Sequence, residues 1–405
     1  MRFSDLKKLK EELPRRRPAP AAPAPQAEAP APQPPTPPIS APEPAAALPA
    51  APAAADKAES RRRAPGPRLM NSQEPAAAGE SRSASFEEQT SRAREVYARL
   101  LTQAGAFLKS VDEPYTEKYE SVSASCALAA ETLKVNSALL YFTSYSTADD
   151  YLRGHTANTT LLALAMGLEA NLDPAELRLL GFCAMAHDIG MTEYSSLYNR
   201  EDRLRDEDFS EMTLHAEAGA AKLDRIVDLD YKIKERARRI ILQTHERADG
   251  SGYPDHASDE ELDPLAQLIS IADAYEAMTH PRAWRGAMEP PDAIKDLIAR
   301  EGRGFNAGAV KLLISVVSLF PPGSVVELST GEIARVLKVN RGSLTRPLVQ
   351  IELDPDFNAA PPRPLDLARH QLTAIERSVA AAELEERNPK YAARLDLARW
   401  WVDWQ

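Results

Sequence analysis

Histidines and aspartates, which are residue types that bind divalent metal ions, recur along the chain at nearly constant intervals. They are His155, the adjacent pair His187 and Asp188, His215, His245 and Asp273. The successive steps between them are 32, 28, 30 and 28 residues. Roughly 30 residues make two short helices with their turns, so each step can return the chain to the same level of a helical bundle. We therefore predict that these side chains meet in one cluster.

The chemistry of such a cluster follows from its ligand types. Imidazoles and carboxylates without thiolates suit iron, manganese or zinc. Asp188 follows a histidine at a predicted helix end, where its two oxygens could bridge two ions. Two ions about 3.5–4 Å apart can clamp a phosphodiester and activate water as the nucleophile. A single His-Asp pair is usually a surface or capping feature, so we rely on the whole set and expect two divalent ions, iron or manganese in the first place, with zinc or a mixture left open.

A second stretch that could do chemistry follows directly after a predicted helix. Residues 243–255 read Gln-Thr-His-Glu-Arg-Ala-Asp-Gly-Ser-Gly-Tyr-Pro-Asp. The glycines and the proline cannot continue a helix, so the backbone must form a loop. This loop offers backbone N–H groups, the aromatic ring of Tyr253 and the cation of Arg247. These are the parts of a pocket for a phosphate ester.

Helical patterns surround both stretches. Asp173 and Pro174 have the residue types of an N-cap and a first helical position. From residue 149 onward we predict helices at about 155–170, 174–188, 208–226, 231–246, 264–278, 291–300 and 307–319. The fold class is therefore mainly α. Three short runs after residue 320 have the composition of strands and predict a small β appendage.

The domain organisation follows from these patterns and from proline. Of the 33 prolines, 18 fall before residue 79, in a tract that can bury almost nothing and is predicted to be disordered. We place a short amphipathic peptide at 1–13, a Pro/Ala-rich linker at 14–80, a helical region at 84–148, the helical domain at 149–320, the β appendage at 321–355 and a tail with a terminal helix at 356–405.

Composition limits the partners and the location. A net charge of −11 argues against nucleic-acid binding, which requires a basic surface. Two cysteines suit a reducing cytosol, so we expect a cytoplasmic protein. No apolar run reaches the length of a membrane span. The N-terminal peptide is either a docking helix for a protein partner or a frayed terminus, and region 84–148 is a candidate sensor or homodimerisation region. The tryptophan-rich end is expected to dock on the domain.

Several of these stretches also carry a family resemblance. Residues 187–190 read His-Asp-Ile-Gly, residues 245–254 read His-Glu-Arg-Ala-Asp-Gly-Ser-Gly-Tyr-Pro, and residues 271–279 read Ile-Ala-Asp-Ala-Tyr-Glu-Ala-Met-Thr. Together with His215 they resemble the HD-GYP family, the cyclic di-GMP phosphodiesterase branch of the HD metal-dependent phosphohydrolases. The likeness covers about residues 149–350. It implies an HD-type helical bundle that hydrolyses cyclic di-GMP, or a related cyclic dinucleotide, in bacterial second-messenger signalling.

The resemblance also implies roles for individual residues. His187 and Asp188 would be the catalytic pair, with Asp188 bridging the ions. The implied metal ligands are His155, His187, Asp188, His215, His245 and Asp273. The implied nucleotide-binding residues are Arg247, Asp249, Gly250, Gly252, Tyr253 and Pro254.

The chain departs from the family pattern at several positions. Thr244 replaces the first of two adjacent histidines, and Met191 replaces a lysine. Tyr151 stands where some members have a glutamate that binds a third metal, Glu276 replaces an aspartate, and residues 305–307 read Phe-Asn-Ala rather than Phe-Asp-Pro. Two hypotheses therefore stay open: a phosphodiesterase, and an attenuated or inactive HD-GYP protein that acts as a nucleotide receptor or protein-interaction module. A hydrolase acting on a different nucleotide is a third, disfavoured by the Gly-Tyr-Pro loop.

Overall fold

The structure is a computed structural model that describes residues 86–113, 118–144, 151–200, 202, 205–282, 285–301, 303–340 and 342–395. All of these belong to one unit of the chain. The predicted N-terminal peptide, the linker and the tryptophan-rich end lie outside the described residues. Within the described part, no helix combines the length and the apolar composition that crossing a bilayer requires.

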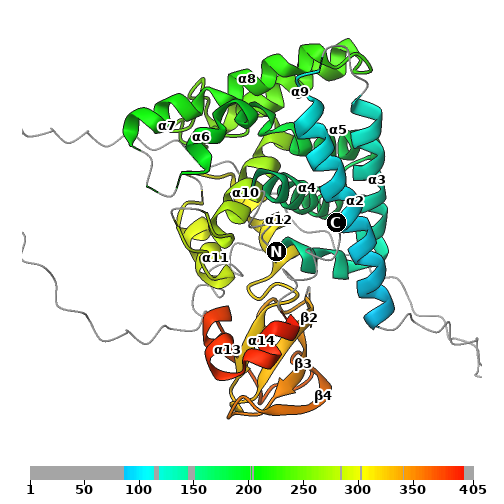
Figure 1. Cartoon of the computed structure of the whole chain (residues 1–405), viewed down its shortest axis with the longest axis vertical. Helices are drawn as coiled ribbons and strands as arrows, with labels where there is room; N and C mark the ends of the chain where they lie inside the picture. The colour runs from blue at the N-terminus through cyan, green and yellow to red at the C-terminus, as the bar shows by residue number, and fades with distance from the viewer. Residues whose placement is uncertain are drawn as a thin grey trace, which may run out of the picture. The chain divides into compact units, whose positions relative to one another are not determined.

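A buried helix lies at the centre of the helical body. Every residue from 154 to 167 of α4 (Tyr151–Glu169) is buried, and a helix buried on all sides has to be enclosed by others. It packs against α5 (Pro174–Ala186) on one side and α10 (Pro264–Thr279) on another (Figure 1). α4 therefore gives the body a rigid core element, and it carries His155 close to its first turn.

Side-chain caps begin the two helices that flank α4. The carboxylate of Asp173 accepts hydrogen bonds from the backbone N–H groups of Ala175 and Glu176, which confirms the predicted cap of α5. Asp263 caps α10 in the same way through Leu265. Such caps satisfy backbone donors that the helix leaves unpaired. The other helical segments, with η marking a 3-10 helix, are α2 (Phe86–Ser110), α3 (Tyr119–Val135), η1 (Ser137–Ser144), η2 (Ile189–Tyr194), α6 (Ser195–Tyr198), α7 (Asp206–Thr213), α8 (His215–Lys222), η3 (Leu223–Arg225), α9 (Tyr231–Gln243), η4 (Asp259–Glu261), α11 (Pro290–Ala299) and α12 (Ala307–Val317).

The prediction of one helix over residues 208–226 is wrong, because the structure has two helices there, α7 and α8, with a break at Leu214. Asp208 does not occupy the N-cap position of the first of them. It is the third residue of α7, where its carboxylate accepts from the backbone N–H of Arg205 at 3.1 Å and from its guanidinium at 2.9 Å. This reciprocal contact begins the helix earlier than predicted. Because of the break, His215 is the first residue of a separate helix.

The C-terminal sheet is larger than predicted. The three predicted strands are present, and the tail placed at 356–405 contributes two more, so the predicted end of the β appendage at residue 355 is too early. β4 contains three prolines, which obscure a strand pattern but are tolerated at a sheet edge because no ladder donor is needed there. The antiparallel order is β4-β3-β2-β1-β5. The elements are β1 (Val325–Leu328), β2 (Ile333–Lys338), β3 (Leu348–Leu353), β4 (Ala359–Asp366) and β5 (Ile375–Ser378), followed by α13 (Ala381–Arg387) and α14 (Pro389–Leu395).

Candidate metal centre

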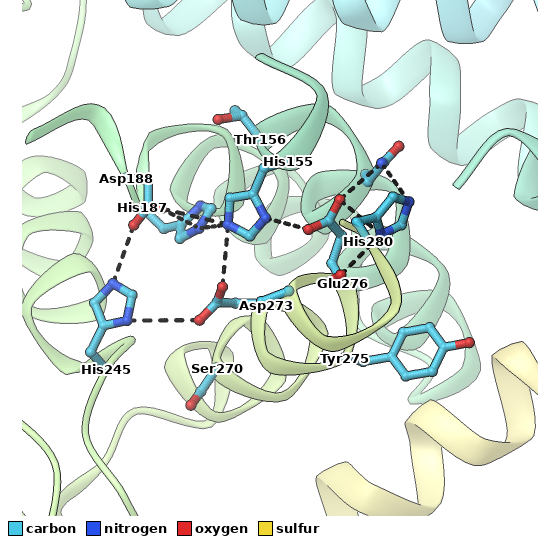
Figure 2. Close-up of polar contacts among 12 residues, drawn as sticks. His155, Thr156, His187, Asp188, His245, Ser270, Asp273, Tyr275, Glu276 and His280 are labelled. Carbon is cyan, nitrogen blue, oxygen red and sulfur yellow. Dashed lines mark hydrogen bonds and ion pairs between the residues drawn. The ribbon is translucent and has the colours of Figure 1, made fainter. Parts of the chain in front are cut away.

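The structure brings all six predicted ligand residues together, and all six are buried. Figure 2 shows most of them converging from separate helices. His155 comes from α4, His187 and Asp188 directly follow α5, His215 begins α8, His245 lies just beyond α9, and Asp273 comes from α10. α9 ends at Gln243 rather than at the predicted 246, so His245 is held by a turn. The predicted convergence is thus observed, whereas ligand roles remain a prediction.

Asp188 lies between two pairs of histidines. Its Oδ2 atom is 3.5 Å from Nε2 of His155 and 3.6 Å from Nε2 of His187. Its Oδ1 atom is 3.3 Å from Nε2 of His215 and 3.2 Å from Nε2 of His245. Each oxygen of one carboxylate therefore faces a different histidine pair. Asp188 forms a potential metal-binding group with each pair.

Hydrogen bonds orient the first histidine pair so that two nitrogen lone pairs face each other. Nδ1 of His187 donates to the carbonyl of Ala184 at 2.8 Å, and Nδ1 of His155 lies 2.5 Å from a carboxylate oxygen of Glu276. In neutral rings, both Nε2 atoms must then be unprotonated. These atoms are buried and only 3.3 Å apart. Between neutral rings these two acceptors would repel each other, and a divalent cation lying against both would remove the repulsion, so the pair could hold a metal ion.

The second histidine pair shows related geometry. Nδ1 of His215 donates to the carbonyl of Met212 at 2.6 Å, which leaves Nε2 of the neutral ring as the free acceptor. This Nε2 atom lies 2.9 Å from Nε2 of His245. Burial lowers the pKa of His245, and the positive charge of His215 lowers it further, although Asp188 opposes the shift. A lowered pKa favours the neutral imidazole that binds metals.

The carboxylates of the cluster remain ionised. Burial would raise the pKa of Asp188, but the charge of His187 and close contacts with the other three histidines hold it well below its ordinary value. The pKa of Asp273 is also lowered, because its contacts with His155 outweigh burial. Oδ1 of Asp273 lies 3.2 Å from Nε2 of His155. Two anionic carboxylates among four imidazole rings form a donor set suited to divalent cations.

Glu276 contacts the ring nitrogen of His155 that faces away from the cluster, a role that sequence reasoning did not assign. It approaches Nδ1 of His155 as above, and its other oxygen accepts from Asn158 at 3.0 Å and lies 3.2 Å from His280 (Figure 2). His280, which the sequence gave no reason to choose, is buried here. The signal was the spacing: Asp273, Glu276 and His280 are three and four residues apart and share a face of α10.

Replacing Glu276 with glutamine is expected to weaken metal binding about tenfold. The carboxylate fixes the ring of His155 and increases its basicity, and loss of such a partner typically costs 10- to 100-fold in metal affinity. Chelator competition with Mn²⁺ would measure the change, and Glu260→Gln, at an exposed position, is the matched control. Equal affinities for the two variants would contradict the assigned role.

The loop after His245 folds back over the cluster. The ring of Tyr253 stacks on the ring of His245, with centroids 5.2 Å apart and planes 10° apart. Gly252 permits this path, because a Cβ atom there would lie 2.3 Å from Cα of Glu246. Glu246 then accepts from the backbone N–H of Asp255 at 2.7 Å and closes the loop. Gly250 has φ of +74°, which only glycine adopts without strain.

Comparisons with known proteins agree with this architecture. Residues 146–307 match the HD domain family, and residues 325–387 match the KOW domain associated with HD domain. The helical domain is thus similar to HD domains. The chain is 27% identical over 226 residues to a cyclic di-GMP phosphodiesterase of Pseudomonas aeruginosa, covering 55% of this chain and 53% of that one. It is 25% identical over 215 residues to cyclic di-GMP phosphodiesterase PdeB of Borreliella burgdorferi, covering 52% and 54%.

A third relative has a different named substrate. A 3'3'-cGAMP-specific phosphodiesterase of Vibrio cholerae is 25% identical over 144 residues, covering 35% of this chain and 27% of that protein. The chain spans about half the length of the first two relatives.

Two of the predicted nucleotide-binding residues, Arg247 and Asp249, contact the loop after His245 and its surroundings. Arg247 donates to the carbonyl of Glu246 at 2.9 Å and to the hydroxyl of Ser270 at 3.0 Å, and its guanidinium lies over the ring of Phe305. The exposed carboxylate of Asp249 accepts from the backbone and hydroxyl of Ser251. These contacts stabilise the loop. Tyr253, rather than Arg247 or Asp249, reaches the histidines, and Pro254 directly follows it.

The departures from the HD-GYP pattern have defined surroundings. The hydroxyl of Thr244 donates to the carbonyl of Ile240 at 3.0 Å, so it is used by the helix end. Met191 is buried at 7% exposure. Tyr151 stacks on the ring of His155, with centroids 5.4 Å apart. Neither of the two contacts supplies an additional metal ligand.

Arg282 provides a cation that sequence reasoning missed. Its guanidinium lies over the ring of Tyr151, 5.2 Å from the centroid. Burial would lower the pKa of Arg282, but interactions with Tyr151, Asp273 and Glu276 raise it above its ordinary value. The signal in the sequence was an arginine just beyond the end of α10, the helix that carries Asp273. A permanent positive charge thus lies beside the cluster.

Proposed function

We propose that this chain is a metal-dependent phosphodiesterase that hydrolyses cyclic di-GMP or a related cyclic dinucleotide. The supporting observation is the Asp188 carboxylate, whose two oxygens face two different histidine pairs. A carboxylate shared in this way suits two ions acting on one phosphodiester. The names of the relatives indicate the substrate class.

The proposed centre holds two divalent ions, iron or manganese. One group comprises His155, His187, Asp188 and Asp273, and the other comprises Asp188, His215 and His245. When bound, the two ions would neutralise charge on phosphoryl oxygens and lower the pKa of a water molecule. The second group offers fewer protein ligands because Thr244 replaces a histidine.

The chain's own residues would prepare this centre and position the substrate. Asp188 and Asp273 stay ionised in a buried site, which favours cation binding. Arg282, whose charge interacts with both carboxylates, would offer a cation to a phosphate oxygen of the diester. Hydrolysis adds water across one P–O bond, and the ribose oxygen leaves with a proton.

Product analysis tests the proposal. The full chain, purified without oxygen and loaded in turn with iron and manganese, is incubated with cyclic di-GMP and with 3'3'-cGAMP, and the products are separated by chromatography. At least one combination of metal and substrate is expected to yield linear dinucleotide or mononucleotide. Chelator-treated protein should yield neither product. A folded, metal-containing sample that yields no product from either substrate would contradict the proposal.

A further inference from the structure

An aromatic side chain extends the cluster toward solvent. Phe209, on α7, is 50% exposed although its side chain is large and apolar. Its ring stands perpendicular to that of Tyr253, with centroids 6.3 Å apart and planes at 89°. Tyr253 in turn stacks on His245. The three rings form a continuous row from a candidate metal ligand to the surface.

Helix α7 fixes the position of Phe209 and also orients His215 of the cluster. The carboxylate of Asp208, the neighbouring residue, accepts from guanidinium groups of Arg200 and Arg205, each at 2.9 Å. One turn later, the carbonyl of Met212 accepts from Nδ1 of His215. α7 is therefore held at both ends. Phe209 has a defined place beside the site rather than a freely moving one.

The surroundings of Phe209 favour a neutral, planar group over a phosphate. The first turn of α7 carries Asp206, Glu207 and Asp208, and the nearby cations Arg200 and Arg205 are paired with these carboxylates, so this end of the helix has no excess positive charge to attract a phosphate. An aromatic base carries no charge and gains from stacking on an exposed ring. The perpendicular rings of Phe209 and Tyr253 form a corner, in which a base can stack on one ring and meet the other through its edge.

We propose that Phe209 and Tyr253 form a stacking platform for one nucleobase of the substrate, with Phe209 as a specificity-determining residue. The inference rests on the proposed function. The diester would lie at the cluster while an attached base covers Phe209. The platform recognises a base by its aromatic face, so it contributes to substrate binding and not to cleavage of the P–O bond.

Steady-state kinetics of Phe209→Leu and Phe209→Trp test this proposal. Leucine keeps the apolar bulk but removes the ring, so KM for the dinucleotide is expected to rise on the order of tenfold while kcat changes little. Tryptophan should restore a KM close to that of the wild type. Tyr231→Ala, which removes an aromatic ring that is 73% exposed at the start of α9, is the control and should leave both constants unchanged.

A second substrate separates base recognition from damage to the site. Methyl 4-nitrophenyl phosphate carries a phosphodiester and no nucleobase, and its kcat/KM should be the same for Phe209→Leu and the wild type within about twofold. An equal loss on both substrates, or an unchanged KM for the dinucleotide, would overturn the platform.

Binding distinguishes this inference from the proposed function. If wild-type protein bound cyclic di-GMP without cleaving it, the proposed activity would be refuted. Kd values measured by calorimetry would then test the role of Phe209 in binding independently of catalysis. A Kd about tenfold weaker for Phe209→Leu than for Phe209→Trp is expected. Equal Kd values for the wild type and both variants would overturn the platform even for an active enzyme.

Discussion

Replacing Asp188 with alanine is expected to abolish metal retention and hydrolysis together. The substitution removes the carboxylate that contacts all four histidines, whereas Asp273 contacts only one histidine of each pair. Four imidazoles would remain, three of them with Nδ1 hydrogen-bonded so that Nε2 faces the centre. Loss of an outer partner alone costs 10- to 100-fold in affinity or activity, so loss of the bridge should reduce turnover by more than about 100-fold.

Two further variants separate the charge of Asp188 from its shape. Asp188→Asn keeps the volume and removes the charge, and it should lose metal nearly as completely as the alanine variant. Asp255→Ala, at an exposed position of the loop, should retain wild-type metal content. For the variants Asp188→Ala, Asp188→Asn and Asp255→Ala we would measure the metal content by mass spectrometry, the turnover rate, and the far-UV circular dichroism spectrum. Full activity of a folded Asp188→Ala protein would refute the bridging role.

The candidate cluster was predictable because it depends on spacing and residue type. Steps of about 30 residues return a helical chain to one level, and His155, His187, His215 and His245 follow that period. The cap at Asp173 was visible for a similar reason, since capping is a local interaction. Local patterns thus predicted the start of α5 and the loop at the glycines, whereas they placed the start of α7 too late.

Features that depend on how helices rotate against one another could not be read from it. The contact of Glu276 with His155 joins positions 121 residues apart, and it requires α4 and α10 to meet on particular faces. Arg247 adjoins a candidate ligand along the chain, yet its side chain turns toward Ser270 and Phe305. Residues close together in a turn point in different directions. Closeness to His245 in the sequence therefore did not predict that the side chain of Arg247 would reach the cluster.

Replacing Gly190 with alanine is expected to destabilise the fold and to disturb the second histidine pair. A Cβ atom at this position would lie 2.0 Å from the carbonyl oxygen of His215 and 2.6 Å from the backbone nitrogen of Gly219. Both atoms belong to the backbone of α8, so a side-chain movement cannot relieve the clash. Inserting a methyl group into packed structure costs about 1–3 kcal/mol, and the upper part of that range is expected here.

The location of the clash predicts which ions are affected. α8 carries His215 at its first position, so displacing this helix moves His215 away from Asp188 while His155 and His187 keep their places on α4 and after α5. Gly190→Ala should therefore show a lower free energy of unfolding in denaturant and roughly one ion fewer per chain. Gly286→Ala is the matched control, because its added Cβ atom meets nothing within 4 Å. Identical unfolding curves and metal content for the two variants would mean that contact between the Asp188 turn and α8 does not determine the second group of ligands.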